Sequence, residues 1–373
     1  MALSEQLAKI FEQCEATQAS DVHLAAGELP RFRLQGQLVP NPSFARLDGE
    51  GVDALAMELG LETLPLGCPD GTERVRTTLL RDGAIDGAIT SPGGSRYRFN
   101  LYRDCGSTAV ALRRLDNEFR SLDALGLPPQ LANFCTCTDG LVVVTGPTGS
   151  GKSTTLATLI DQINRTRQGH IITIEDPVEF RHVSRKCLVN QRQVGRDARS
   201  FNGALIEALR QDPDVILVGE MRDLETIRTA ITAAETGHLV FATLHAGDCA
   251  GAVERLVSAF PAAEQEGVRH QLALVLRGIF AQHLLPAVTG GRAAACELLV
   301  NTTAVANLIA TGRSAQLYSV METSANQGMV ALDQSLADLL GRGRIAEVTA
   351  FALSRNPESL RRRVWIGRGF ENG

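Results

Sequence analysis

A segment near the middle of the chain reads Leu141-Val142-Val143-Val144-Thr145-Gly146-Pro147-Thr148-Gly149-Ser150-Gly151-Lys152-Ser153-Thr154. Its first five residues are apolar or β-branched and predict a strand, and the residues from Ser153 to about Arg165 have the spacing of a helix. Between the two lies the full G-x-x-x-x-G-K-S pattern, in the strand–loop–helix context that a phosphate-binding loop requires. We therefore predict an α/β domain built around this loop.

The residue types in this loop suit a bound nucleotide. Glycines let the backbone turn tightly and direct several N–H groups at an anion, and the helix that follows adds its positive N-terminal end. We expect Lys152 to reach the β- and γ-phosphates and Ser153 to ligate Mg²⁺. The expected ATP-binding residues are Gly146, Pro147, Thr148, Gly149, Ser150, Gly151, Lys152, Ser153 and Thr154.

Length, charge and cysteine usage limit the class of protein. A chain of 373 residues is long enough for two or more domains. A net charge of −5 and a pI near 5.9 argue against nucleic acid as the main partner. The eight cysteines contain no C-x-x-C pair, which argues against a four-cysteine zinc site and favours reduced thiols in the cytosol. We expect neither a signal peptide nor a direct membrane span.

The pattern of apolar residues changes along the chain. The first 115 residues mix helical spacing, as at Leu7, Ile10, Phe11 and Cys14, with alternating strands that include Arg81–Ile89 and Arg96–Arg103, which predicts a small α+β domain. From Gly140 apolar strands alternate with helices, which is typical of a largely parallel sheet. After Glu254 we expect mostly helix. The predicted domains are residues 1–115 and 116–373.

Three further segments place polar residues at the ends of predicted strands, where open α/β sheets bind ligands. Glu175 and Asp176 follow the predicted strand His170–Ile174. Glu220 follows the predicted strand Val215–Gly219, in the manner of a Walker B carboxylate beside Mg²⁺. Arg222 and Asp223 come next and could form an ion pair. His238 and His245 bracket the third strand. For His245, both a nucleotide-sensing role and a structural role remain open.

Together these segments resemble the secretion ATPase superfamily, and within it the PilT-like twitching-motility ATPases of type IV pili. The resemblance covers nearly the whole chain. Glu175–Glu179 resembles the Asp box of that family, Leu209–Asp223 its extended Walker B segment, and Gly237–His245 its His box. Ala19–Leu24 is similar to the opening strand of its PAS-like N-terminal domain. The resemblance implies a RecA-like P-loop core with this smaller α+β domain in front of it.

The resemblance also implies how the residues act. It implies a homohexamer in which the N-terminal domain of one subunit closes over the RecA-like domain of its neighbour. Glu175 would activate water, Glu220 would support Mg²⁺, and His238 and His245 would belong to the nucleotide-sensing strand. Cations supplied by a neighbour can speed phosphoryl transfer greatly. Arg96, Arg98 and Arg113 match family arginines, with solvated surface charges as the alternative for each.

The absence of a four-cysteine insert favours the retraction class, which implies a cytoplasmic ATPase at an inner-membrane pilus platform protein. One departure is the segment Ala304–Thr311, where two arginines and a glutamate of that class are missing. A divergent or accessory role therefore stays open. The alternatives are a VirB11-like ATPase of type IV secretion or conjugation, a nucleotide-binding regulator without turnover, and a RecA relative that acts on DNA.

Overall fold

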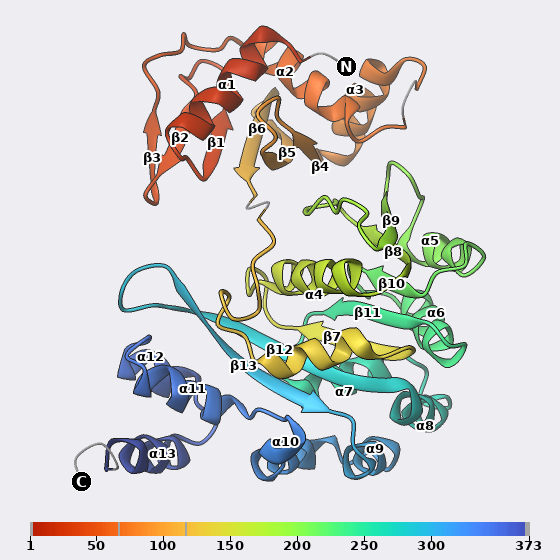
Figure 1. Ribbon diagram of the computed structural model, residues 1–373. Coiled ribbons are helices and arrows are strands. Elements are labelled where there is room, and N and C mark those ends of the chain that lie inside the picture. Colours follow the sequence, from red (N-terminus) through yellow and green to blue (C-terminus); the bar gives the residue numbers. More distant parts are fainter. Residues whose placement is uncertain (1–2, 66–67, 116–117, 370–373) are drawn as a thin grey trace. The chain divides into compact units, whose positions relative to one another are not determined.

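The computed structural model describes residues 3–65, 68–115 and 118–369, which form two compact units (Figure 1). The N-terminal unit contains Met1–Glu118 together with Ile174–His182 and Gln191–Ser200. The core unit contains Phe119–Thr173, Val183–Asn190 and Phe201–Gly373. Two segments far along the chain thus belong to the N-terminal unit by their contacts, a grouping that the domain division at residue 115 did not anticipate. That division stays a prediction.

The N-terminal unit has an antiparallel sheet in the order β3-β2-β1-β6-β5-β4, with helices packed on β4, β5 and β6. The expected α+β class is confirmed. The elements are α1 (Glu5–Ala16), β1 (Asp21–Leu24), β2 (Arg31–Leu34), β3 (Gln37–Pro40), α2 (Gly49–Leu61), α3 (Gly71–Asp82), β4 (Ala84–Thr90), β5 (Arg96–Asp104) and β6 (Ser107–Arg114).

Helix α3 corrects the strand expected over Arg81–Ile89. The helix runs to Asp82 and ends at Gly83, whose positive φ of 80° is the left-handed conformation common just after a helix. The strand begins only at Ala84. On α1 the expected apolar face is confirmed, since Leu7, Ile10, Phe11 and Cys14 are all buried. This face joins the core of the unit, where the rings of Phe11 and Tyr97 lie 4.6 Å apart.

The core unit is built on a seven-stranded sheet in the order β13-β12-β7-β11-β10-β8-β9. Strands β10, β11, β7 and β12 run parallel, and β13 is antiparallel to β12. The expected α/β class with a largely parallel sheet is confirmed. The strands are β7 (Gly140–Thr145), β8 (Gly169–Glu175), β9 (Cys187–Gln193), β10 (Val215–Val218), β11 (Leu239–Leu244), β12 (Leu276–Pro286) and β13 (Arg292–Val300).

Helices pack on this sheet and continue beyond it to the C-terminus (Figure 1). Helix α4 packs on β7, α6 on β7 and β11, α7 on β12 and β13, and α11 on β13. No helix in the described residues has both the length and the hydropathy of a membrane span. The helices are α4 (Lys152–Thr166), α5 (Phe201–Ala208), α6 (Leu224–Glu235), α7 (Cys249–Ser258), α8 (Gln265–Val275), α9 (Thr303–Ala310), α10 (Leu317–Thr323), α11 (Leu332–Gly341), α12 (Glu347–Leu353) and α13 (Pro357–Gly369), with short 3-10 turns at Pro129–Thr136, Ser314–Gln316 and Ala325–Gln327.

The hairpin of β12 and β13 shows that the helical expectation after Glu254 is wrong in part. Residues 293–299 of β13 are all buried, so this strand lacks the alternation of a half-exposed strand. Three consecutive alanines, Ala293 to Ala295, also favour helix by local propensity. The tertiary pairing with β12 overrides that preference, and the long hairpin extends the sheet beside β7.

Candidate nucleotide-binding and catalytic site

The loop Gly146–Gly151 joins β7 to α4 through backbone conformations that suit glycine. The φ angles of Gly146, Gly149 and Gly151 are 145°, 78° and 92°. A Cβ atom at Gly146 would lie 2.3 Å from the backbone oxygen of Gln282, closer than atoms can approach. The sequence pattern therefore reflects both left-handed turns and close packing, as a backbone cradle for phosphate needs.

Gln282 of β12 packs against this loop, and no sequence pattern indicates it. Its side chain is buried, and its Oε1 accepts a hydrogen bond of 2.6 Å from the Thr155 hydroxyl of α4. A Cβ atom at Gly151 would lie 2.9 Å from its Nε2. The helix expected after Glu254 does not place Gln282 at the loop, whereas β12 pairs with β7 directly beside it.

Lys152 begins α4 and reaches back over the loop. Its Nζ donates to the backbone oxygens of Gly146 at 2.8 Å and Pro147 at 3.0 Å. Burial lowers the pKa of the ammonium group, and the negative charge of Glu220 opposes that shift. The loop therefore holds a cation at the place where the sequence pattern predicts the β- and γ-phosphates.

The carboxylate of Glu220 lies beside Arg222 and His245. Arg222 Nε lies 2.6 Å and His245 Nε2 lies 3.0 Å from the same carboxylate oxygen, Oε1. Burial raises the pKa of Glu220, but the hydrogen bond from Arg222 and the charges of Arg222, His245 and Lys152 outweigh it, so the pKa is lowered. Glu220 is therefore held as a carboxylate close to the loop.

His245 reaches this cluster because β7, β10 and β11 are parallel neighbours whose carboxyl ends meet at one edge of the sheet. The hydroxyl of Thr243 donates to the backbone oxygen of Gly219, and Met221 N–H donates to Thr243 at 3.1 Å. These bonds continue the pairing of β10 and β11 beyond the regular strands. They bring Glu220 and His245 together.

Hydrogen bonds and an ion pair place three further residues, Arg222, Asp223 and His238. The ion pair suggested for Arg222 and Asp223 stays a prediction: Arg222 pairs with Glu220, and Asp223 caps α6 by accepting the Thr226 N–H at 2.8 Å. His238 lies at the amino end of β11, where its Nδ1 is 3.0 Å from the backbone oxygen of Ala233. The structure does not bring His238 to the carboxyl edge, and its nucleotide role stays a prediction.

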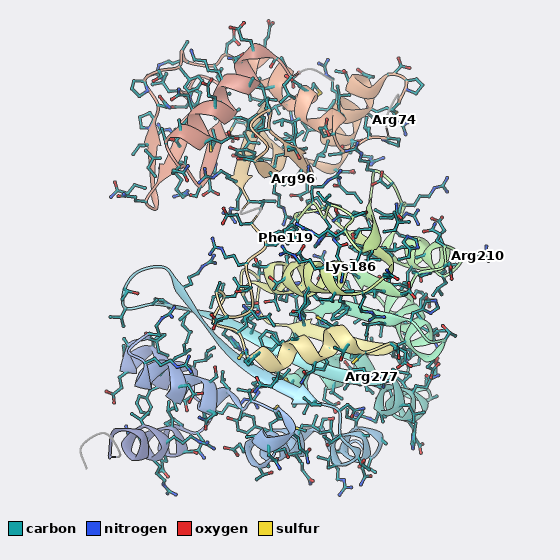
Figure 2. The ribbon with its side chains drawn as sticks, in the orientation of Figure 1. Arg74, Arg96, Phe119, Lys186, Arg210 and Arg277 are labelled. Atoms are coloured by element: carbon teal, nitrogen blue, oxygen red, sulfur yellow. The ribbon has the colours of Figure 1, made fainter. Side chains whose placement is uncertain are left out.

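Glu175 ends β8 and belongs to the N-terminal unit. Its Oε1 accepts a 3.3 Å hydrogen bond from Gln191 Nε2, which also donates to the Phe180 backbone oxygen at 2.7 Å. Arg96 of β5 holds the same segment: its Nε and Nη2 donate to the Val178 backbone oxygen at 3.2 and 3.0 Å (Figure 2). The segment that carries Glu175 is therefore bound to the N-terminal sheet.

The three candidate arginines differ in their surroundings. Arg96 is 7% exposed, and burial followed by the charge of Arg181 lowers its pKa to about 10. Arg98 Nη1 lies 3.7 Å from Glu179 and its Nη2 lies 3.6 Å from Asp86. Arg113 keeps 71% of its side chain exposed while its Nε bonds Asp21 at 2.8 Å. Arg113 thus has the most exposed side chain of the three, whereas the guanidinium of Arg96 is buried and hydrogen-bonded to the Val178 backbone.

The donor set fits a nucleoside triphosphate with Mg²⁺. The loop offers backbone N–H groups, the N-terminus of α4 and the Lys152 ammonium to phosphate oxygens. The Ser150 hydroxyl is buried and bonds no group in the described part of the chain. The exposed Ser153 hydroxyl and the Glu220 carboxylate are hard oxygen ligands of the kind that Mg²⁺ prefers.

Comparisons with known proteins agree with this geometry. Residues 101–351 match the family model of the type II/IV secretion system protein. The chain is 42% identical over 341 residues to the type IV pilus retraction ATPase PilT of Pseudomonas aeruginosa, covering 91% of this chain and 96% of that protein. It is 38% identical over 349 residues to the type IV pilus ATPase PilU of the same organism, covering 93% and 88%.

A solved structure has the same fold as this chain. The crystal structure of the pilus retraction motor PilT with bound ADP superimposes with a TM-score of 0.85 at 43% identity, covering 97% of this chain and all of that one. The fold of this chain thus recurs over nearly its whole length in a relative whose structure contains ADP. This chain belongs to the type II/IV secretion system protein family, among its PilT-like P-loop ATPases.

Proposed function

We propose that the chain is a Mg²⁺-dependent, homohexameric ATPase that couples ATP hydrolysis to type IV pilus retraction and twitching motility. It acts from the cytoplasm on an inner-membrane platform protein, to which it binds peripherally. Residues 1–115 form the PAS-like domain and residues 116–373 the RecA-like domain with its helical C-terminal part. The names of the relatives, a pilus retraction ATPase and a pilus retraction motor, support the choice of pilus function.

The observation that carries this proposal is the cluster at Glu220. A lysine that follows β7, a carboxylate that follows β10 and a histidine that follows β11 come from three neighbouring parallel strands. A ligated Mg²⁺ would neutralise phosphate charge there, with Ser153 and Glu220 as its protein ligands. Lys152 would bind the β- and γ-phosphates, and His245 would respond to them through its contact with Glu220.

In the proposed reaction Glu175 is the general base that takes a proton from the attacking water. Removal of a general base costs about 10²–10⁴-fold in rate. Gln191 orients the carboxylate through the bond to Oε1. Arg113, with Arg98 beside it across β5 and β6, supplies positive charge to the active site of a neighbouring subunit.

The biochemical test is steady-state ATP turnover by the wild type and by Glu175→Gln, with Mg²⁺ and with EDTA, alongside sizing by light scattering. We expect hexamers, turnover that needs Mg²⁺, and a loss of about 10²–10⁴-fold in kcat for the variant at similar ATP affinity. A wild type that binds ATP without turnover would instead indicate a nucleotide-binding regulator. A protein that hydrolyses ATP as a monomer would contradict the ring.

The cellular test is a deletion strain scored for twitching and for pilus number. Loss of twitching with excess surface pili supports retraction. Loss of conjugation or protein export with normal twitching would favour the VirB11-like alternative. Unchanged twitching until a second retraction ATPase is also deleted would indicate the accessory role, which the missing charges of α9 keep in consideration.

A further inference from the structure

A cluster of three charged side chains in the core unit, of which Glu297 is buried and Asp248 and Arg355 are partly exposed, lies outside the candidate site. Glu297 of β13 has a side chain that is 1% exposed, and its Oε2 accepts the Cys249 N–H at 3.0 Å. Its Oε1 lies 3.0 Å from Nε of Arg355, whose Nη2 lies 2.6 Å from Asp248. We call Asp248, Glu297 and Arg355 the C-terminal clamp. A buried carboxylate is costly unless it is paired, so this geometry is a constraint on the fold.

Arg355 is itself fixed by the C-terminal helices. It lies between α12 and α13, and its backbone N–H donates to Asp333 of α11 at 3.1 Å. Asp333 also accepts the Asn356 N–H at 3.0 Å and is fully buried. The guanidinium carbon stacks over the Tyr318 ring of α10 at 4.6 Å. The position of this guanidinium therefore depends on the positions of α10 and α11 together.

The other end of the clamp is the loop that leaves the nucleotide edge. Asp248 comes three residues after His245 and caps α7 by accepting the Gly251 N–H at 2.6 Å. Ala246 N–H donates to the hydroxyl of Thr145, the residue just before the phosphate-binding loop, at 2.9 Å. Residues 245–248 thus contact the Walker B carboxylate, the start of the loop and the clamp within four residues.

We propose that Arg355 is a positioning residue that transmits the state of the nucleotide site to the C-terminal helices. Any shift of His245 on nucleotide binding moves a short loop whose last residue holds the Arg355 fork. Movement of the Arg355 side chain would move α10 and α11 with it, because its stacking contact lies on α10 and its backbone hydrogen bond lies on α11. This coupling rests on the proposed ATPase function.

The charges of the C-terminal clamp are not needed for stability alone. Burial raises the pKa of Glu297, and the charge of Arg355 opposes that rise. Hydrophobic residues of similar volume would replace such a pair at little or no cost in stability. The two ion pairs do restrict the orientation of the guanidinium, because Nη2 lies beside Asp248 while Nε lies beside Glu297.

The test is hydrogen–deuterium exchange of the full-length protein with AMP-PNP and with ADP. We expect the wild type to show different uptake in the two states over α10 and α11. Asp248→Asn keeps the helix cap but loses the charge that Arg355 binds. We expect it to abolish the difference while AMP-PNP affinity stays within about threefold. Arg355→Gln should do the same, and Arg355→Lys should retain part of the difference.

The control is Arg361→Gln, which removes a positive charge from α13 whose guanidinium carbon lies over the Phe351 ring, 5.3 Å from the ring centroid. It should keep the wild-type difference. The proposal is overturned if the wild type shows no difference, or if Asp248→Asn keeps it in full. A wild type without ATP turnover would contradict the proposed function itself. A wild type that hydrolyses ATP but gives either of these exchange results would overturn only the proposed role of the C-terminal clamp.

Discussion

Two carboxylates of the core unit, Glu220 and Glu297, are paired with arginine in different surroundings. Glu220 is 17% exposed, and its hydrogen bond from Arg222 lowers its pKa despite burial. Glu297 is 1% exposed, and burial raises its pKa despite Arg355. The arginine partner is the same type of residue, so the difference comes from the deeper burial of Glu297 and from the further charges of His245 and Lys152 beside Glu220. Glu220, at a site that must exchange ligands, stays in contact with solvent. Glu297, which lies where the C-terminal helices pack on the core unit, is shielded from solvent.

The largest expected effect is on turnover at the solvated carboxylate. Glu220→Gln keeps the shape but removes the charge that Arg222, His245 and Lys152 surround. We expect kcat for ATP hydrolysis to fall about 10²–10³-fold, the size of losing one preorganised electrostatic group. Steady-state kinetics with a thermal melt to confirm folding checks it. A variant with more than a tenth of wild-type turnover would remove Glu220 from the catalytic site.

The next effect is on stability at the buried carboxylate. Glu297→Ala leaves Arg355 with one partner and the Cys249 N–H without its acceptor. We expect a loss of about 3 kcal/mol in the free energy of unfolding. The matched control is Glu322→Ala, which breaks the half-buried pair with Arg363 and should cost less than about 1 kcal/mol. Urea unfolding monitored by circular dichroism measures both, and equal costs would contradict the comparison.

The pH dependence of stability should differ in sign between the two. The lowered pKa of Glu220 gives a stabilising contribution that is present above the ordinary glutamate value and is lost as pH falls through the native pKa. The raised pKa of Glu297 gives a contribution that is present below the ordinary value and is lost as pH rises through the native pKa.

Melting temperatures of the wild type, Glu220→Gln and Glu297→Gln, measured from acid to neutral pH, separate these contributions. Glu220→Gln should remove a rise in stability with pH on the acid side. Glu297→Gln should remove a fall in stability as pH increases above the ordinary glutamate value. Parallel curves for the two variants would show that burial does not distinguish the two carboxylates. The expected changes are smaller than those of Glu297→Ala.

The smallest effect tests charges that α9 lacks. Ala306 and Ala310 are half-buried positions one turn apart, where the retraction class has arginine. Restoring both as Ala306→Arg with Ala310→Arg should change the free energy of unfolding by no more than about 0.5 kcal/mol, since surface changes are mild and arginine suits helices. ATP turnover should stay within about twofold. A larger twitching zone at equal turnover would place the limit on coupling rather than on hydrolysis.

Much of the fold and part of the site could be predicted from local patterns. The α/β class followed from the strand–loop–helix context of Gly146–Ser153, and the apolar face of α1 followed from its spacing. The pairing of β12 with β13 could not be predicted, because buried strands rich in alanine carry no alternation. For the same reason Gln282 was missed, although it packs directly beneath the glycines.

The sequence by itself determined which groups could carry the chemistry: a lysine and serine in a glycine loop, and acidic and histidine residues at strand ends. Those assignments depend on short-range order, since a motif contains its own strand, turn and helix. Only the tertiary structure decided that Arg222 pairs with Glu220, that Arg96 bonds the segment carrying Glu175, and that Arg355 reaches Asp248. Partners that are distant along the chain, such as Arg96 with Val178 and Arg355 with Asp248, are chosen by packing and burial, which no local pattern records.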